Sequence, residues 1–143
     1  MIETHLAEIE EIKRLKARYC RLLDTKQWDA WRDVFVDDFT GIYELPPNPA
    51  SEFSSADAIV ETNKVILRDA ETTHHVFSPE IEIGDGGNAD GVWAMFDFVR
   101  LPAFAFKGYG HYRDRYLKCT DGQWRIASTH LTRLHVERIS GDQ

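Results

Sequence analysis

Three residues of this chain have the chemistry of an acid–base site: Tyr19, Asp24 and His74. Tyr19 lies on an apolar helical stripe that ends at Asp24. A carboxylate at that end has the wrong sign for the helix dipole, so a local partner is needed to hold it. An imidazole titrates near pH 6.5, about where a proton can be accepted and returned, once another group orients it. These three residue types together indicate a buried polar pocket.

The histidine is one of an adjacent pair, His74 and His75, in a segment expected to be a strand. Neighbouring side chains of a strand point to opposite faces, so at most one of the two can face an interior site. Alternation alone does not choose between them, and a lone strand histidine is more often structural than catalytic. Asp24 is the natural carboxylate to orient whichever imidazole faces the pocket.

Asp97 and Tyr43 are two further candidates for the pocket. Asp97 shares its strand face with Trp93 and Val99, and the opposite face is also apolar. Because burial disfavours the charged form, this carboxylate needs a partner or a raised pKa. Backbone donors or an arginine at the strand end, such as Arg100, could be that partner. Tyr43 supplies a second phenol, with a role as a core aromatic as the alternative.

The elements that must position these residues are helices first and strands last. Apolar residues at helical spacing predict helices at 2–24, 28–36 and 58–70, with residues 54–57 able to cap the third. A strand is predicted at 39–45, followed by a proline-rich loop at 46–49. Four longer strands are predicted at 73–83, 92–106, 108–119 and 123–136, with glycine-containing turns at 85–87 and 121–122. This order predicts an α+β fold, with helices packed on one face of a curved antiparallel sheet.

Composition favours one globular domain and excludes several classes of partner. The chain has 143 residues, of which 43% are hydrophobic, which suits a single domain spanning 1–143. Its net charge is −7, and its 17 lysines and arginines form no block that could follow a phosphate backbone, so no nucleic-acid partner is expected. No apolar run approaches the roughly 20 residues of a bilayer span, so no membrane partner is expected and the location predicted is cytoplasmic. Cys20 and Cys119 lack metal or redox spacing and are expected to be free thiols; no metal site is expected.

These residues resemble those of one family, which includes SnoaL-like polyketide cyclases, scytalone dehydratase, bile acid dehydratase and ketosteroid isomerase. The resemblance covers nearly the whole chain. It rests on the helix ending at residues 19–24, Trp28 with Trp31, the third helix, residues 73–75 and the strand motif at 121–126. It implies a single SnoaL-like domain with the cone-shaped α+β barrel of the nuclear transport factor type, in which N-terminal helices pack on a curved mixed, mostly antiparallel sheet.

The resemblance also implies roles for five residues. Asp24 and His74 resemble the catalytic carboxylate–histidine pair of the dehydratases in this family. The first histidine of the pair is preferred because its spacing to the end of its strand matches the family pattern. Tyr19 resembles the phenol of bile acid dehydratase, and Tyr43 resembles one phenol of scytalone dehydratase. Asp97 resembles a pocket acid of the bile acid enzyme.

Four positions are expected to contact substrate: Trp93, Val99, Tyr112 and Asp114. Tyr112 and Asp114 replace a small polar pair of scytalone dehydratase. Leu23 and Ala103 stand where that enzyme has a second phenol and a second histidine. Scytalone itself is therefore not the expected substrate.

The chemistry that these groups support is removal of a proton next to a carbonyl, followed by loss of a β-hydroxyl. We expect a lyase or isomerase without a cofactor, catalysing dehydration, isomerisation or cyclisation of a small apolar polycyclic or aromatic substrate. The aromatic segment 92–106 also predicts a homo-oligomer, either a dimer or a trimer. The alternative is a noncatalytic ligand binder or assembly subunit of the same fold, resembling the small subunit of ring-hydroxylating dioxygenases.

Overall fold

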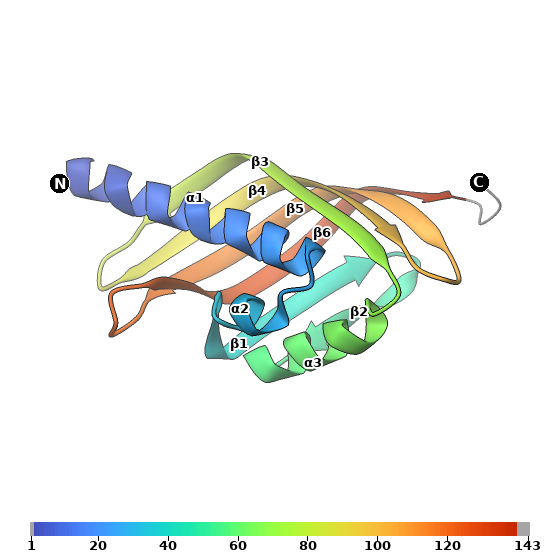
Figure 1. Cartoon of the computed structure of the whole chain (residues 1–143). Coiled ribbons are helices and arrows are strands. Elements are labelled where there is room, and N and C mark those ends of the chain that lie inside the picture. Colours follow the sequence, from blue (N-terminus) through green and yellow to red (C-terminus); the bar gives the residue numbers. More distant parts are fainter. Residues whose placement is uncertain (1, 140–143) are drawn as a thin grey trace.

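The computed structural model describes residues 2–139, drawn in Figure 1. The helices are α1 (Ile2–Asp24), α2 (Trp28–Arg32) and α3 (Ala56–Ile66). The strands are β1 (Phe35–Leu45), β2 (Asn48–Phe53), β3 (Glu71–Ile83), β4 (Asn88–Arg100), β5 (Ala105–Lys118) and β6 (Trp124–Ile139). Helices therefore dominate the first half of the chain and long strands the second half, as predicted.

Helix α1 forms where apolar residues recur at helical spacing, and it buries that stripe against the sheet. Ile12, Leu15, Tyr19 and Leu23 are all at most 4% exposed. Lys16 lies on the same stripe and is also fully buried. Among the described residues, no helix combines the length and apolar character that crossing a bilayer requires. The helix instead places its last residues against β3.

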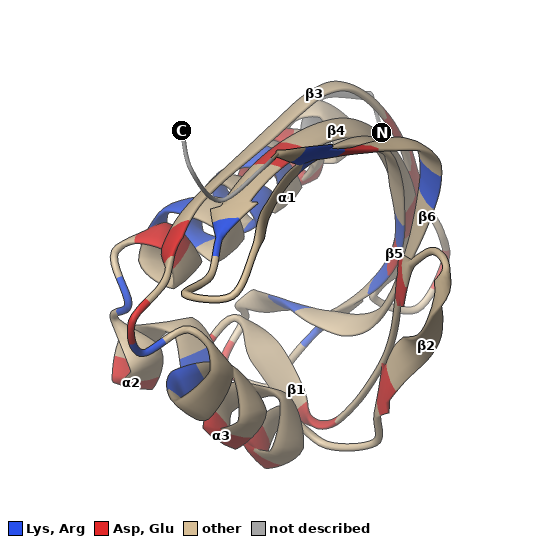
Figure 2. Cartoon of the chain, turned by 90° about the vertical axis from the view of Figure 1, so that its right-hand side faces the viewer, with Lys and Arg blue, Asp and Glu red and all other residues tan. Residues whose placement is uncertain are grey.

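The six strands form one mixed sheet in the order β2-β1-β6-β5-β4-β3. Strands β1 and β6 pair in parallel, and every other neighbouring pair is antiparallel. Figure 2 shows the sheet curving from β3 round to β1, with the three helices on its open side. The edge strands β2 and β3 do not pair with each other, so the cone stays open. The predicted fold class, helices on one face of a curved and mostly antiparallel sheet, is confirmed.

The outer face of the sheet, away from the helices, carries a row of rings across four strands: His75, Phe96, Tyr109 and His135. Successive ring centroids are 6.4, 5.4 and 5.7 Å apart. Most of the aromatic residues of 92–109 are thus on this face or near the strand ends. The homo-oligomer stays a prediction, and this row is the surface on which it would depend.

The boundary between α2 and β1 differs from the prediction. Helix α2 ends at Arg32 rather than residue 36, and β1 begins at Phe35 rather than residue 39. The backbone N–H of Ile126 donates to the carbonyl of Val34 at 2.8 Å, and Phe35 is in register with Ile126. Pairing with the last strand therefore overrides the helical spacing of the local sequence.

Other boundaries also differ from the prediction, among them the starts of β4 and β5, at Asn88 and Ala105 rather than residues 92 and 108. The proline-rich segment is a tight turn followed by β2, an edge strand in which Pro49 needs no inward N–H partner. The long strand predicted at 92–106 ends at Arg100, and the Leu101 N–H donates to the Phe104 carbonyl at 2.8 Å to form a turn. Helix α3 ends at Ile66 rather than at 69–70. In the first two segments, Pro46, Pro47 and Pro102 lie in short turns that connect neighbouring strands.

The start of α3 gives a first testable prediction. Ser55 is the N-cap, and its hydroxyl accepts a hydrogen bond from the Ala58 N–H at 3.0 Å. Replacing Ser55 with alanine should lower the free energy of unfolding by about 1 kcal/mol. Urea denaturation measures this loss. Ser54→Ala is the matched control and should change it by less than about 0.5 kcal/mol; equal losses for the two variants would contradict the assignment of the cap.

Candidate active site

A cavity of about 190 Å³ lies between the inner face of the sheet and the three helices. Its apolar walls include Leu23, Trp31, Ile59, Val99, Phe106 and Leu131. Its polar groups include Tyr19, Tyr43, Thr72, His74, Asp97 and Arg133. All three helices and all six strands contribute to these walls, which explains why residues far apart in the sequence meet here.

The end of α1 joins the start of β3 through Asp24 and His74. Oδ1 of Asp24 is 2.7 Å from Nδ1 of His74 and accepts a second bond from the Thr72 hydroxyl at 2.9 Å. Oδ2 accepts from the backbone N–H of His74 at 2.8 Å. These three donors stabilise the Asp24 carboxylate, which the helix dipole alone would disfavour at this end of α1.

This contact also fixes the form of the imidazole. A carboxylate only accepts hydrogen bonds, so Nδ1 of His74 carries a hydrogen and Nε2 is free to take a proton. Asp24 itself does not line the cavity, so its position behind His74 suits an orienting group. His75 points to the outer face, where its ring lies near Phe96.

Two phenols form a second polar group of the cavity. The hydroxyls of Tyr19 and Tyr43 are 3.1 Å apart. Burial raises the pKa of both phenols above the usual value, so both stay protonated near neutral pH. One hydroxyl donates to the other, and the hydrogen of the accepting hydroxyl is then available to a ligand. Tyr19 and His74 therefore line different walls of the cavity, the first from α1 and the second from β3.

Asp97 has a buried partner, but it is not the predicted one. Both of its oxygens accept from the guanidinium of Arg133, at 2.8 and 2.9 Å, and the two side chains are 2% and 5% exposed. Nε of Arg133 also donates to the Glu44 carbonyl at 2.6 Å. Arg100, the strand-end arginine considered from the sequence, lies instead near Glu71, 3.9 Å away and exposed.

Arg133 is one cavity residue that the sequence analysis missed. A signal was present, because Arg133 alternates with Thr129 and Leu131 on the buried face of the last strand. A cation at that position needs an anion on a neighbouring strand. Reading the last strand for charged residues on its apolar face would have found the partner of Asp97.

Gly108 provides a test of how tightly this ion pair is packed. A methyl group built at Gly108 would overlap both the guanidinium of Arg133 and the carboxylate of Asp97. Replacing Gly108 with alanine should therefore lower the free energy of unfolding by about 1–3 kcal/mol, since the buried pair has little room to move. The unfolding midpoint in urea measures the effect. A midpoint equal to that of the wild type would show that the pair moves freely.

Two of the four expected substrate contacts lie elsewhere. Val99 and Tyr112 line the cavity, whereas Trp93 and Asp114 do not. The indole N–H of Trp93 donates to the Tyr116 hydroxyl at 2.9 Å, which donates to Asp114 at 2.8 Å. Trp93 and Asp114 thus belong to a buried network that offers no surface to a ligand in this cavity.

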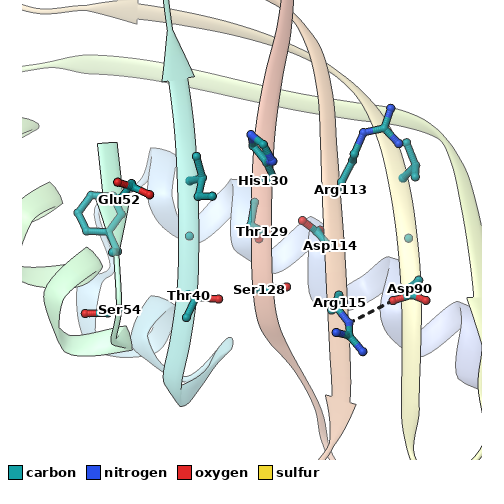
Figure 3. A pocket seen from close by; sticks show the side chains of 15 residues that line it. Thr40, Glu52, Ser54, Asp90, Arg113, Asp114, Arg115, Ser128, Thr129 and His130 are labelled. Atoms are coloured by element: carbon teal, nitrogen blue, oxygen red, sulfur yellow. Dashed lines mark ion pairs between the residues drawn. The ribbon is translucent and has the colours of Figure 1, made fainter. Parts of the chain in front are cut away.

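A larger hollow of about 820 Å³ lies on the outer face of the sheet, opposite the helices. Figure 3 shows Arg115 and Asp90 beside each other on neighbouring strands of this hollow. This pair is 3.5 Å apart, but its side chains are 73% and 70% exposed, so water screens them. Acid–base groups act best in a site from which water is largely excluded. The smaller inner cavity is therefore the candidate active site.

Comparisons with known proteins agree with this fold. The chain matches the model of the SnoaL-like domain over residues 4–130. A protein of unknown function from Mycobacterium tuberculosis, Rv3472, has 28% identity and a TM-score of 0.79, over 92% of this chain and 75% of that one. A protein proposed to be a scytalone dehydratase, from Novosphingobium aromaticivorans, has 24% identity and a TM-score of 0.82, over 98% and 93%. A type 2 hexachlorocyclohexane dehydrochlorinase, LinA, has 15% identity and a TM-score of 0.84, over 99% and 95%.

Proposed function

Because the chain belongs to the SnoaL-like domain family, we propose that it is a cofactor-independent lyase that removes a proton next to a carbonyl. The observation that carries this proposal is the contact of 2.7 Å between Asp24 and His74 at the wall of the cavity. The phenols of Tyr19 and Tyr43 on another wall supply hydrogen-bond donors for the carbonyl oxygen. A base and an electrophilic donor at one cavity are the parts that enolisation requires.

The proposed reaction begins at Nε2 of His74. This nitrogen takes a proton from the carbon next to the carbonyl, and the electron pair of that C–H bond moves towards the carbonyl oxygen. A hydrogen of the Tyr19–Tyr43 pair stabilises the resulting enolate. The electrons then return and expel a hydroxyl group from the β-carbon, and the imidazolium donates its proton to that leaving oxygen. Asp24 stays ionised and stabilises the imidazolium between the two steps.

The size of the cavity limits the proposed substrate. A dry cavity of roughly 150 Å³ is known to hold one benzene ring. The present cavity, at about 190 Å³, suits a molecule of one or two rings better than a steroid-sized one. Its walls of leucine, valine and phenylalanine favour an apolar ring, with the carbonyl directed at the phenols.

The similar proteins favour elimination among the reactions considered. One is proposed to be a dehydratase and another is a dehydrochlorinase, names that denote loss of water and of hydrogen chloride. Both reactions start with removal of a proton beside the leaving group. We therefore propose dehydration ahead of isomerisation or cyclisation for this chain.

The test is a set of one- and two-ring β-hydroxy ketones, incubated with the purified protein and followed by absorbance of the conjugated enone product. We expect turnover of at least one compound by the wild type and none above background by His74→Ala. Binding of these ketones without any turnover by the wild type would contradict the proposal and favour the noncatalytic alternative. Equal rates of product formation by the wild type and by His74→Ala would place the chemistry outside this site.

A further inference from the structure

A lysine is buried against Tyr19, one of the phenols of the inner cavity. Lys16 lies on α1 one turn before Tyr19, and its ammonium is 2.8 Å from Oδ2 of Asp114 on β5. Both side chains are 0% exposed. Lysine is almost never fully buried unless it is paired, and a buried pair often stabilises a fold no better than apolar residues of the same size. Stability alone is therefore a weak reason for this pair.

The ammonium lies against the faces of two phenol rings. Its distance is 4.2 Å to the ring centroid of Tyr19 and 3.7 Å to that of Tyr112. Both distances are within the range in which a cation is attracted to an aromatic ring, and the effect grows when water is excluded. The Asp114 carboxylate that holds the ammonium also accepts a hydrogen bond from Tyr116. The ammonium therefore lies between a carboxylate and two aromatic rings.

We propose that Lys16 is a positioning residue that stabilises the negative charge moving onto Tyr19 as its hydroxyl donates to an enolate oxygen. This inference rests on the proposed function and assigns the Lys16–Asp114 pair to it. Burial makes the Tyr19 phenol a weaker acid than a phenol in water. A fixed cation against the ring offsets that effect at the moment when charge develops.

The surroundings of Tyr19 identify the charges that act on it. The titratable groups near it are Lys16 and Cys20 on α1, Tyr43 on β1, and Tyr112 and Asp114 on β5. Burial raises the pKa of the Cys20 thiol to about 12, so it is uncharged at working pH. Trp31 and Phe35 add uncharged rings. Among these groups the charged ones are Lys16 and Asp114, and the ammonium is the charge in contact with the Tyr19 ring.

The test removes both charges together, in the double variant Lys16→Met/Asp114→Asn. Lys16→Met alone would leave Asp114 unpaired in the core and is expected to unfold the protein. The double variant leaves no buried charge at this position and should keep the unfolding midpoint of the wild type. The matched control is Lys13→Met, which removes an exposed lysine from the same helix.

The readout is binding of two probes that need no turnover. A nitro-substituted naphthol that is anionic at neutral pH places an oxyanion at the phenols, whereas naphthalene has the same rings and no charge. We expect the double variant to bind the naphtholate about tenfold more weakly than the wild type, with naphthalene unchanged. With the ketone substrates, kcat should fall about as much while KM stays nearly constant.

Three results would overturn the inference: equal weakening for both probes, no weakening for either, or no binding of the naphtholate by the wild type. The first would show that Lys16 only shapes the cavity. A selective loss for the naphtholate in a protein that turns over no ketone would instead keep the inference about Tyr19 and reject the proposed reaction.

Discussion

Replacing His74 with alanine is expected to lower the turnover number for a ring-containing β-hydroxy ketone by about 100- to 10,000-fold. Its Nε2 is the proposed base, and its orientation is set by the contact of 2.7 Å between Nδ1 and Asp24. Steady-state kinetics of enone formation measure the loss. The side chain is 10% exposed at the cavity, so its removal should change binding of the ketone less than turnover.

His75 offers a control that the chain itself supplies. It is the next residue of β3, but its side chain points to the outer face. His75→Ala should therefore keep the turnover number within about twofold, because a surface change far from the chemistry seldom shifts free energies by more than about 0.5 kcal/mol. An equal loss in both variants would mean that the strand is disturbed rather than the base removed.

Asp24→Asn should reproduce much of the loss seen for His74→Ala. The asparagine amide can no longer hold Nδ1–H and stabilise the imidazolium as a carboxylate does. Because Asp24 does not line the cavity, KM should stay nearly constant while kcat falls by at least about tenfold. A variant with unchanged kcat would remove Asp24 from the mechanism.

Replacing Arg133 with methionine is expected to lower the free energy of unfolding by about 3–5 kcal/mol. The carboxylate of Asp97 is 2% exposed and takes both of its close donors from this guanidinium. Without Arg133 it would be a buried charge with no partner, which is far less favourable than a neutral group in the same place. Urea denaturation of the purified variant measures the change.

The double variant Asp97→Asn/Arg133→Met separates the lost pair from the lost packing. Removing both charges leaves no unpaired ion, so most of the stability should return. If the double variant were as unstable as Arg133→Met alone, the aliphatic stem of the arginine and not its charge would account for the loss.

The parts of the fold that follow local rules could be predicted from the sequence. Helix α1 has a strong helical repeat, and the turns at 85–87 and 121–122 contain glycines that adopt positive φ angles of 77°, 78° and 83°. The start of β1 and the whole of β2 could not be predicted in this way. The start of β1 depends on pairing with β6, where Phe35 takes its register from Ile126, about ninety residues away. Strand β2 pairs with its neighbour β1 across the turn at 46–47, in a segment whose prolines had indicated a loop.

The candidate site shows the same division. Tyr19 and Asp24 stood out because they are polar residues on and at the end of an apolar helical stripe. His74 stood out because its imidazole could complete an acid–base site with them. Arg133 and Lys16 carry the same signal on β6 and α1, but their partners come from other strands. Which anion meets which cation is decided by strand order and register. Trp93 and Asp114 were expected at the ligand for lack of that information.

Exchange with solvent deuterium would show whether His74 removes a proton next to a carbonyl. A one- or two-ring ketone without a leaving group would be incubated with the protein in D₂O, and the signal of its α-hydrogen followed by proton NMR. We expect loss of this signal with the wild type and with His75→Ala, and exchange at the background rate with His74→Ala. Exchange at the wild-type rate in His74→Ala, or none with the wild type for any ketone that binds, would contradict this role of His74.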